Sequence, residues 1–409
     1  MHLLSIDWSS VGLKAAQLVL SLSILVILHE FGHYITARWF KCRVEKFYLF
    51  FDPWFSLHKK KIGETEYGVG WLPLGGYVKI AGMVDESMDK EQLKEPAKEW
   101  EFRSKPAWQR LIIMLGGIIV NVLLAFVIYS MILMVWGEKD IKADSLKYGL
   151  AFNDPLFKNL GFENGDKIVS VDGKPVEDLT DVLKQLILVD SSVTIIRNGE
   201  KRDLKMPVDL IGNLIEKRKK SEQPLIAPRV PVIALDFPKN SNLIDAGMHK
   251  GDRVIGIDSY TTNFRDEYQS VVSGYKKGKS VVLKVSRNDS TFMVNTTMAE
   301  DGMVGFFSPV LPAQFDSLGV YHFEVKKYGF FAAIPAGINK SVEELVFYID
   351  QFKKILSPST GAYKGVGGFK AMGSVFSGNG WDWEHFWTIT AFFSIVLAFM
   401  NLLPIPALD

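Results

Sequence analysis

The chain has 409 residues, of which 48% are hydrophobic and 23% are charged, and its formal net charge is +1. This length allows more than one domain, and a nearly neutral chain without a long basic face gives no reason to expect a nucleic-acid partner. Cys42 is the single cysteine, which excludes a disulfide within this sequence and a cluster of thiolate ligands. Any zinc ion must therefore use nitrogen and oxygen ligands.

A first membrane helix is predicted within residues 1–40, where the apolar run from 11 to 39 is long enough to cross about 30 Å of hydrocarbon. Its C-terminal end carries His29, Glu30 and His33 in an H-E-x-x-H pattern. Two histidines four residues apart lie on one face of a helix and can bind one zinc ion, while the glutamate can take a proton from a water molecule. Ionisable residues in a membrane helix are costly and usually functional, which favours a catalytic zinc site over a chance match.

Residues 41–104 follow as a loop, and the lysines and arginines in and around it are the strongest basic bias beside any apolar run, which places the loop in the cytoplasm. The N-terminus and residues 138–385 are then outside, and the H-E-x-x-H pattern lies near the cytoplasmic face. Within the loop, residues 66–80 alternate glycine with bulky apolar residues and turn near Pro73, which predicts a β-hairpin. We expect it either to enter the membrane beside the metal site or to be an ordinary surface hairpin.

A second membrane helix is predicted within residues 105–137, where the apolar run from 111 to 136 is the clearest in the chain. It contains a Gly-Gly pair at 116 and 117, followed by Asn121. Small residues let helices pack closely in lipid, and a buried amide needs hydrogen-bond partners. Asn121 therefore either serves helix packing or faces the active site.

An internal repeat lies between the second and third apolar runs. Residues 161–172 recur as residues 247–258, and in each copy a Gly-Asp turn leads into an alternating strand. The repeat predicts two similar small domains, at 138–212 and 229–312, joined by a charged linker at 213–228.

Residues 313–384 connect the second copy to the last apolar run. The apolar spacing within 325–356 predicts a helix that either rests on the membrane surface or packs on the second domain. The glycine-rich stretch 361–380 predicts a loop or hinge.

A third membrane helix is predicted within residues 385–409, next to tryptophans that suit the membrane interface. Asn401 begins a tail of the form Asn-x-x-Pro-x-Pro-x-Leu-Asp, in which Pro404 and Pro406 cannot continue a helix. Unwound backbone at membrane depth implies burial against a site. Because the third helix runs inward, its end returns to the level of the two histidines, and Asp409 is the candidate third zinc ligand.

Together, the H-E-x-x-H helix, the two repeats and this tail resemble the site-2 protease family of intramembrane zinc metalloproteases over essentially the whole chain. The resemblance implies a polytopic α-helical membrane protein with a membrane-reentrant β-hairpin and two inserted PDZ-like α/β domains. It implies at least three transmembrane helices here, and a fourth after residue 409, where family members continue.

The family's motifs also imply the parts of the site. One Zn2+ per chain is expected on His29, His33 and Asp409, with Glu30 as the catalytic residue, and the hairpin is expected to pair with substrate as an added strand. The residues that we expect to contact substrate are Tyr67, Gly68, Val69, Gly70, Asn121, Asn401, Pro404 and Pro406.

The implied function is cleavage within transmembrane segments of single-pass membrane proteins, such as anti-sigma factor type regulators and remnant signal peptides, with or without an earlier first-site cleavage. The implied location is the bacterial inner membrane, with the PDZ-like domains in the periplasm, where they either bind peptides or exclude substrates with bulky external domains. The alternative is a membrane-anchored PDZ scaffold with a structural zinc, but structural zinc needs four protein ligands and we find three. The expected partners are the lipid bilayer and membrane-protein substrates, not nucleic acid.

Overall fold

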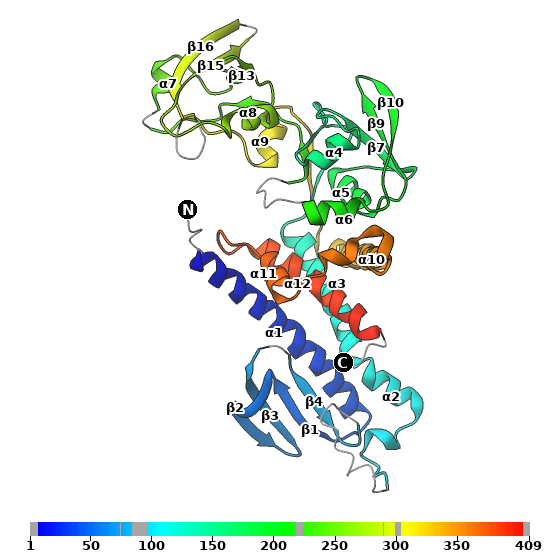
Figure 1. Cartoon of the computed structure of the whole chain (residues 1–409). Helices are drawn as coiled ribbons and strands as arrows, with labels where there is room; N and C mark the ends of the chain where they lie inside the picture. The colour runs from blue at the N-terminus through cyan, green and yellow to red at the C-terminus, as the bar shows by residue number, and fades with distance from the viewer. Residues whose placement is uncertain are drawn as a thin grey trace. The chain divides into compact units, whose positions relative to one another are not determined.

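The structure, a computed structural model, describes residues 7–73, 75–83, 96–217, 224–239, 241–288, 290–298 and 304–403. The chain divides into two compact units. The helical unit consists of Met1–Gly137, Lys326–Phe352 and Val366–Asp409, and the repeat unit consists of Glu138–Val325 and Lys353–Gly365 (Figure 1).

Among the described residues, three helices are long and apolar enough to cross a membrane: α1 (Trp8–Trp39), α3 (Gly116–Val135) and α12 (Trp383–Leu402). They are the candidates for the three predicted spans. The Asp7 carboxylate caps α1 by accepting from the backbone amides of Ser9 and Ser10. α3 packs against both α1 and α12, and His29, His33 and Asn121 lie on the buried faces of α1 and α3.

The second predicted helix is interrupted. A short helix, α2 (Ala107–Met114), ends at Leu115, and α3 begins at the next residue. The backbone of α3 then lies against α1, because a Cβ atom on Gly116 would stand only 2.6 Å from the carbonyl oxygen of Gly32. This close approach requires glycine and brings the first turn of α3 next to the histidines.

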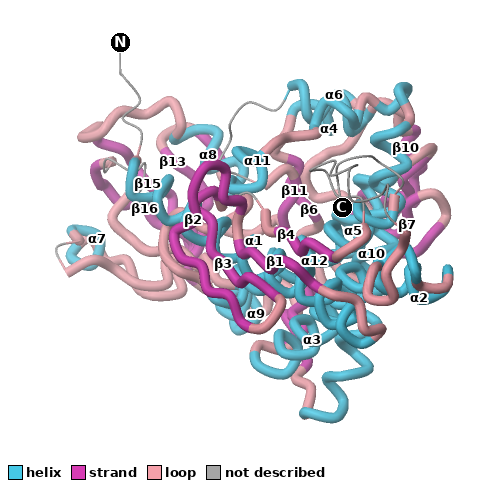
Figure 2. Tube along the Cα trace, turned by 90° about the horizontal axis from the view of Figure 1, so that it is seen from below, coloured by secondary structure: helices cyan, strands magenta, loops and turns pink. Residues whose placement is uncertain are grey.

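A four-stranded sheet follows α1, and Figure 2 shows its strands in magenta. The strands are β1 (Val44–Leu49), β2 (Phe51–Ile62), β3 (Thr65–Leu72) and β4 (Tyr77–Ile80), in the order β2-β3-β1-β4. β1 pairs parallel with β3 and antiparallel with β4, and β2 pairs antiparallel with β3.

The predicted hairpin at 66–80 is therefore wrong. Both strands exist, but β1 lies between them. The side chain of Tyr48 on β1 explains the pairing, because its ring occupies the space beside Gly68, where a Cβ atom would stand 2.2 Å from the ring. Because residue 68 is glycine, the ring of Tyr48 fits beside it, and β1 can lie next to β3.

The repeat unit contains two copies of one arrangement. The first copy consists of β7 (Lys167–Val171), β8 (Lys174–Pro175), α5 (Leu179–Leu188), β9 (Ser192–Arg197) and β10 (Glu200–Lys205). The second consists of β13 (Arg253–Ile257), β14 (Tyr260–Thr261), α8 (Arg265–Val272), β15 (Ser280–Arg287) and β16 (Ser290–Thr297). In each, the first strand pairs with the second and third strands, and the third pairs with the fourth. The internal repeat in the sequence is thus a repeat of structure.

The Gly-Asp turn of each copy is held by the same ion pair. An arginine at the end of the third strand contacts the turn aspartate, at 2.7 Å between Arg197 and Asp166 and at 2.6 Å between Arg287 and Asp252. Burial raises the pKa of Asp252, but the Arg287 guanidinium and the His249 amide outweigh this effect, so the pKa lies below its ordinary value.

The first copy is completed by segments from both sides of the second copy. β6 (Leu150–Phe152) pairs with β11 (Ile226–Pro228), and β5 (Glu138–Ile141) pairs with β17 (Phe323–Lys326). The hydrophobic core of the first copy also takes in three residues that follow the second copy, namely Phe315, Val320 and Tyr321.

These pairings differ from the predicted boundaries. The expected linker at 213–228 contributes β11 and most of a helix, α6 (Leu210–Lys217), to the first copy. The first domain is therefore not limited to 138–212, and the second copy is inserted within it. The remaining short elements of the repeat unit are α4 (Pro155–Asn159), β12 (Val232–Ile233), α7 (Asn242–Asp245) and α9 (Pro312–Ser317).

A helix is present where one was predicted before the third span, and it is α10 (Phe330–Leu356). It packs on α3 and α12: a Cβ atom on Gly337 would meet Ser130 at 2.2 Å, and Tyr348 makes edge-to-face contacts with Phe392 and Phe399. Whether this helix rests on the membrane surface stays a prediction.

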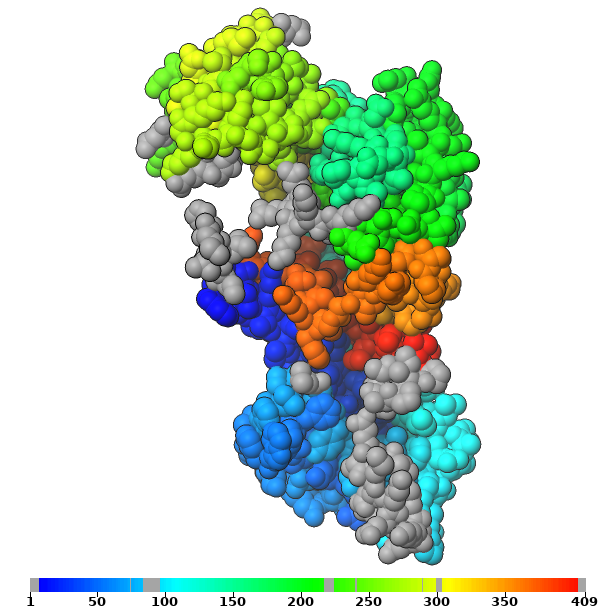
Figure 3. Space-filling model, in the orientation of Figure 1, coloured from blue at the N-terminus to red at the C-terminus, as the bar shows by residue number. Residues whose placement is uncertain are grey.

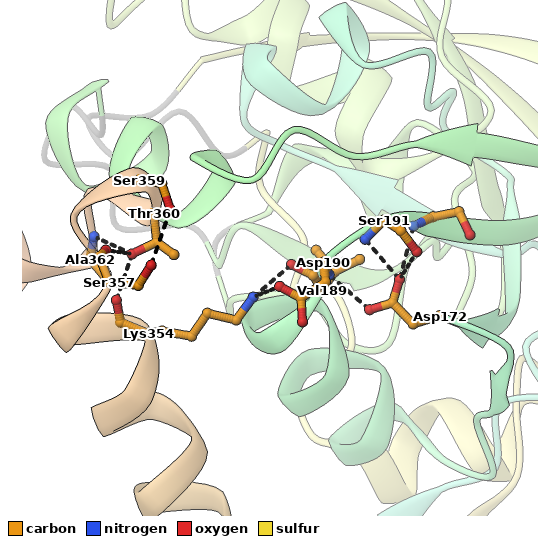
Figure 4. A network of polar contacts seen from close by, with 10 residues as sticks. Asp172, Val189, Asp190, Ser191, Lys354, Ser357, Ser359, Thr360 and Ala362 are labelled. Atoms are coloured by element: carbon orange, nitrogen blue, oxygen red, sulfur yellow. Dashed lines mark hydrogen bonds and ion pairs between the residues drawn. The ribbon is translucent and has the colours of Figure 1, made fainter.

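The last turn of α10 belongs to the repeat unit. Lys354 donates to the Val189 carbonyl at 3.1 Å and pairs with the Asp190 carboxylate (Figure 4). The predicted loop at 361–380 begins after η3 (Pro358–Thr360) and contains η4 (Ala362–Gly365) and α11 (Phe369–Ser374), so it is partly helical.

Candidate metal centre

His29 and His33 lie on the buried face of α1, with only 4% and 8% of their surfaces exposed. Their Nε2 atoms are 3.2 Å apart. Two nitrogen ligands bound tetrahedrally to one zinc ion at the usual bond length would be about 3.3 Å apart. The two rings therefore already have the spacing of a shared metal ion.

The second nitrogen of each ring has its own partner. Nδ1 of His33 lies 2.8 Å from the carbonyl oxygen of Ile113, at the end of α2, and a carbonyl can only accept. His33 therefore carries a proton on Nδ1, so Nε2 is the nitrogen with which it can bind a metal. Nδ1 of His29 faces the side-chain amide of Asn121 on α3 at 3.0 Å.

Gly117 forms the wall of the site on α3. A Cβ atom at this position would stand 2.5 Å from His33 Nε2 and 2.5 Å from His29 Cε1. Only glycine leaves room there for the two rings. Ile113 and Gly117 were not among the predicted site residues: a backbone carbonyl has no sequence signal, and the Gly-Gly pair one turn before Asn121 was interpreted as general helix packing.

Glu30 follows His29 on α1 and is half-buried. The chain that enters β4 passes beside it, because a Cβ atom on Gly76 would lie 3.4 Å from Cγ of Glu30 and 3.0 Å from Val26. The structure thus places the start of an edge strand next to the predicted general base.

Asn401, in the last turn of α12, reaches the histidines from the third side. Its side-chain nitrogen lies 3.2 Å from Nε2 of His29. The predicted residues Pro404, Pro406 and Asp409 lie outside the described residues. Within the described part of the chain, no three histidine, cysteine, aspartate or glutamate residues come together as a metal site, so it supplies two ligands, both imidazoles.

The other predicted substrate residues lie in β3. Tyr67 contacts Tyr34 through their hydroxyl groups at 2.7 Å. Gly68, Val69 and Gly70 pair with β2, and the first two pair with β1 as well. β3 therefore has no free edge in this sheet.

The donor set fits zinc. Two imidazoles converge through Nε2, and each is oriented by a partner on its other nitrogen, which is how histidine ligands of zinc are held in proteins. The site lies within a helix that can cross a membrane, so these polar rings are buried at a cost that a bound metal would offset.

Known proteins are similar to this chain over much of its length. The model of peptidase family M50 matches residues 17–409. The regulator of sigma-E protease RseP of Escherichia coli (strain K12) is 28% identical over 421 residues, which cover 96% of this chain and 88% of that protein. The regulator of sigma E protease of Salmonella typhi is 24% identical over 425 residues, which cover 100% of this chain and 89% of that protein.

A third relative is similar over a shorter stretch. A Rickettsia conorii protein assigned to the zinc metalloproteases is 33% identical over 225 residues, covering 53% of this chain and 59% of that protein. Because the family model covers nearly all of the sequence, the chain belongs to peptidase family M50, as its resemblance to the site-2 proteases predicts, and it is a zinc metalloprotease.

Proposed function

We propose that this protein hydrolyses peptide bonds within transmembrane segments of single-pass membrane proteins in a bacterial inner membrane. The observation that carries the proposal is the pair of converging imidazoles, with Glu30 beside them, on a helix long and apolar enough to span the bilayer. Anti-sigma factor type regulators and remnant signal peptides are the substrate classes that we propose, by analogy with the relatives named as regulators of sigma-E.

The residues take separate parts in the proposed reaction. His29, His33 and Asp409 would hold one zinc ion, which when bound supplies Lewis acidity and eases deprotonation of water near neutral pH. The Glu30 carboxylate takes the proton from the attacking water and passes it to the departing amine nitrogen. Asn401, close to His29, is placed to bind the substrate backbone near the cut bond.

A substrate helix must unwind before cleavage, because its carbonyl groups are engaged in internal hydrogen bonds. We propose that the unwound segment adds as a strand to β4. β4 is at the end of the sheet, and among the described strands only β1 pairs with it, whereas β3 is paired on both edges. The entry to β4 also lies beside Glu30, so an added strand would run toward the proposed base.

The two copies of the repeat unit are proposed to be PDZ-like domains in the periplasm, with the loop 41–104 and the active site toward the cytoplasm. We favour a size filter over specific peptide binding, since neither copy specifies a particular peptide. Deleting both copies should then release cleavage of substrates that retain bulky external domains.

Replacement of Glu30 tests the proposed chemistry. The Glu30→Gln variant should keep zinc and bind substrate but lose cleavage of a model transmembrane peptide by several orders of magnitude, because glutamine cannot accept the proton. Zinc content and cleavage are measured on the purified wild type and variant in detergent. Equal cleavage by both proteins would contradict the role of Glu30, and zinc binding without any cleavage by the wild type would favour a scaffold.

A further inference from the structure

Asn121 is the one polar side chain of α3 that lies against a predicted zinc ligand. It is completely buried, and its side-chain nitrogen faces Nδ1 of His29 at 3.0 Å. Its side-chain oxygen is also buried and has no hydrogen-bond partner among the residues that the structure describes. A buried amide oxygen without a donor is unfavourable, so this arrangement calls for an explanation.

The hydrogen bonds around His29 depend on which ring nitrogen carries the proton. The nitrogen of Asn121 faces Nδ1, and Nε2 faces both the nitrogen of Asn401 at 3.2 Å and Nε2 of His33. An amide nitrogen only donates, whereas an imidazole ring always carries a proton on at least one nitrogen. If the proton is on Nδ1, Asn121 must therefore present its oxygen to His29.

The arrangement of His33 decides which nitrogen of His29 carries the proton. His33 uses Nδ1 on the Ile113 carbonyl, and its Nε2 converges with Nε2 of His29. A shared metal between these two atoms requires an unprotonated Nε2 on His29, so its proton is on Nδ1. The group that faces Nδ1 must then accept, and turning the Asn121 amide by 180°, which leaves its shape almost unchanged, places the oxygen there.

We propose that Asn121 is the positioning residue for His29: its side-chain oxygen accepts the Nδ1 proton and thereby directs Nε2 to the metal. Each zinc-binding histidine then has its own oxygen acceptor, a backbone carbonyl from Ile113 for His33 and a side-chain amide for His29. This role rests on the proposed zinc site and replaces substrate contact as the function of Asn121.

Asn121 is itself fixed from a third helix. Its backbone carbonyl accepts from the Ser394 hydroxyl of α12 at 2.7 Å, and Ser394 is also fully buried. The bond from Ser394 is made to the backbone and leaves the amide of Asn121 free for His29. The two contacts can therefore be separated by mutation.

Matched variants at position 121 test the proposal. Asn121→Leu keeps the size of the side chain and removes the acceptor, whereas Asn121→Asp keeps an acceptor oxygen. We measure the zinc dissociation constant of the purified chain by competition with a chelator. We expect about 10- to 100-fold weaker binding for Asn121→Leu, as for other partners of zinc-bound histidines, and wild-type or tighter binding for Asn121→Asp.

The absorption spectrum of the cobalt-substituted protein is a second measurement. If Asn121 only stabilised the fold, its variants would not change this spectrum in the pattern that we expect. The spectrum should change in Asn121→Leu, since His29 is free to rotate, and stay as in the wild type in Asn121→Asp. Ser394→Ala is the control, because it removes the bond to the backbone of Asn121 and leaves its amide in place. If Asn121→Leu does not fold, Asn121→Ala provides the same comparison.

Three results would overturn the proposal: wild-type zinc affinity in Asn121→Leu, equal losses in Asn121→Leu and Asn121→Asp, or an equal loss in Ser394→Ala. The outcome is independent of proteolysis, since zinc affinity is measured without substrate. Failure of the proposed protease function would instead appear as a zinc-loaded wild type that cuts no transmembrane peptide.

Discussion

The space between α3 and the two histidines is set by the absence of one methyl group at Gly117. Ring atoms of both histidines lie where its Cβ atom would be. A polar site inside a membrane protein cannot relax by admitting solvent as a surface site does, so the fit at this position has to come from the chain itself.

Gly117→Ala should abolish zinc binding and cleavage. The added methyl group would stand 2.5 Å from the metal-facing nitrogen of His33 and would displace it or the helix. Gly12→Ala is the matched control on α1, because nothing lies within 4 Å of a Cβ atom there. Zinc content per chain and cleavage of a transmembrane peptide are measured for both, and full zinc loading in Gly117→Ala would contradict the close approach.

At the scale of elements, the four-stranded sheet limits where the proposed addition of a substrate strand can take place. A strand accepts another strand only along a free edge, and β3 has none. Among the described strands, β4 offers one beside Glu30, and its short length of four residues limits the added pairing to the neighbourhood of the site.

Disulfide trapping distinguishes the two strands. In a Glu30→Gln background with buried Cys42 replaced by serine, Val78→Cys on β4 should form a disulfide with a cysteine placed near the cut bond of a substrate. Val69→Cys on β3 should give at most a few per cent of that yield, because both of its neighbours are strands of the same sheet. The yield is measured on non-reducing gels. A higher yield with Val69→Cys than with Val78→Cys would place the substrate on β3 and contradict our proposal.

Much of this arrangement could be predicted from the sequence, because it is encoded locally. The three spans follow from long apolar runs, His29 and His33 share a face because they are four residues apart, and the repeat follows from recurring residues. The order of the sheet could not be predicted in this way. It depends on the packing of Tyr48 into the space beside Gly68, and such non-local pairings have no period along the chain.

At the scale of the whole molecule, the two copies of the repeat unit share a well-bonded junction, and Figure 3 shows them as adjacent lobes. Arg229, which follows β11 of the first copy, pairs with Glu267 of α8 at 2.6 Å and lies 4.0 Å from the ring centre of Phe264. Asn164 of the first copy donates to Asp266 at 2.6 Å. A filter for bulky substrates needs a fixed opening, and this junction holds the two copies together.

Arg229→Ala should weaken the junction between the two copies and let them move relative to each other. With spin labels at exposed Lys174 and Lys284, one in each copy, the distance distribution should be narrow in the wild type and clearly broader in the variant. Arg202→Ala serves as the control, because its pair with Glu200 is exposed and lies within the first copy. We expect the broadening to be accompanied by faster cleavage of substrates with bulky external domains. Identical distributions would show that the junction does not hold the copies.

The insertion of the second copy within the first has a consequence for the order in which the protein is made. The second copy is complete once residues 229–309 have emerged, since its core is built from that stretch. The first copy cannot fold completely until later, because Phe315, Val320 and Tyr321 complete its core and β17 pairs with β5. The first copy thus begins earlier along the chain but completes its fold later during synthesis. Its incomplete core stays exposed while the ribosome adds the roughly 90 residues that separate β11 from Tyr321.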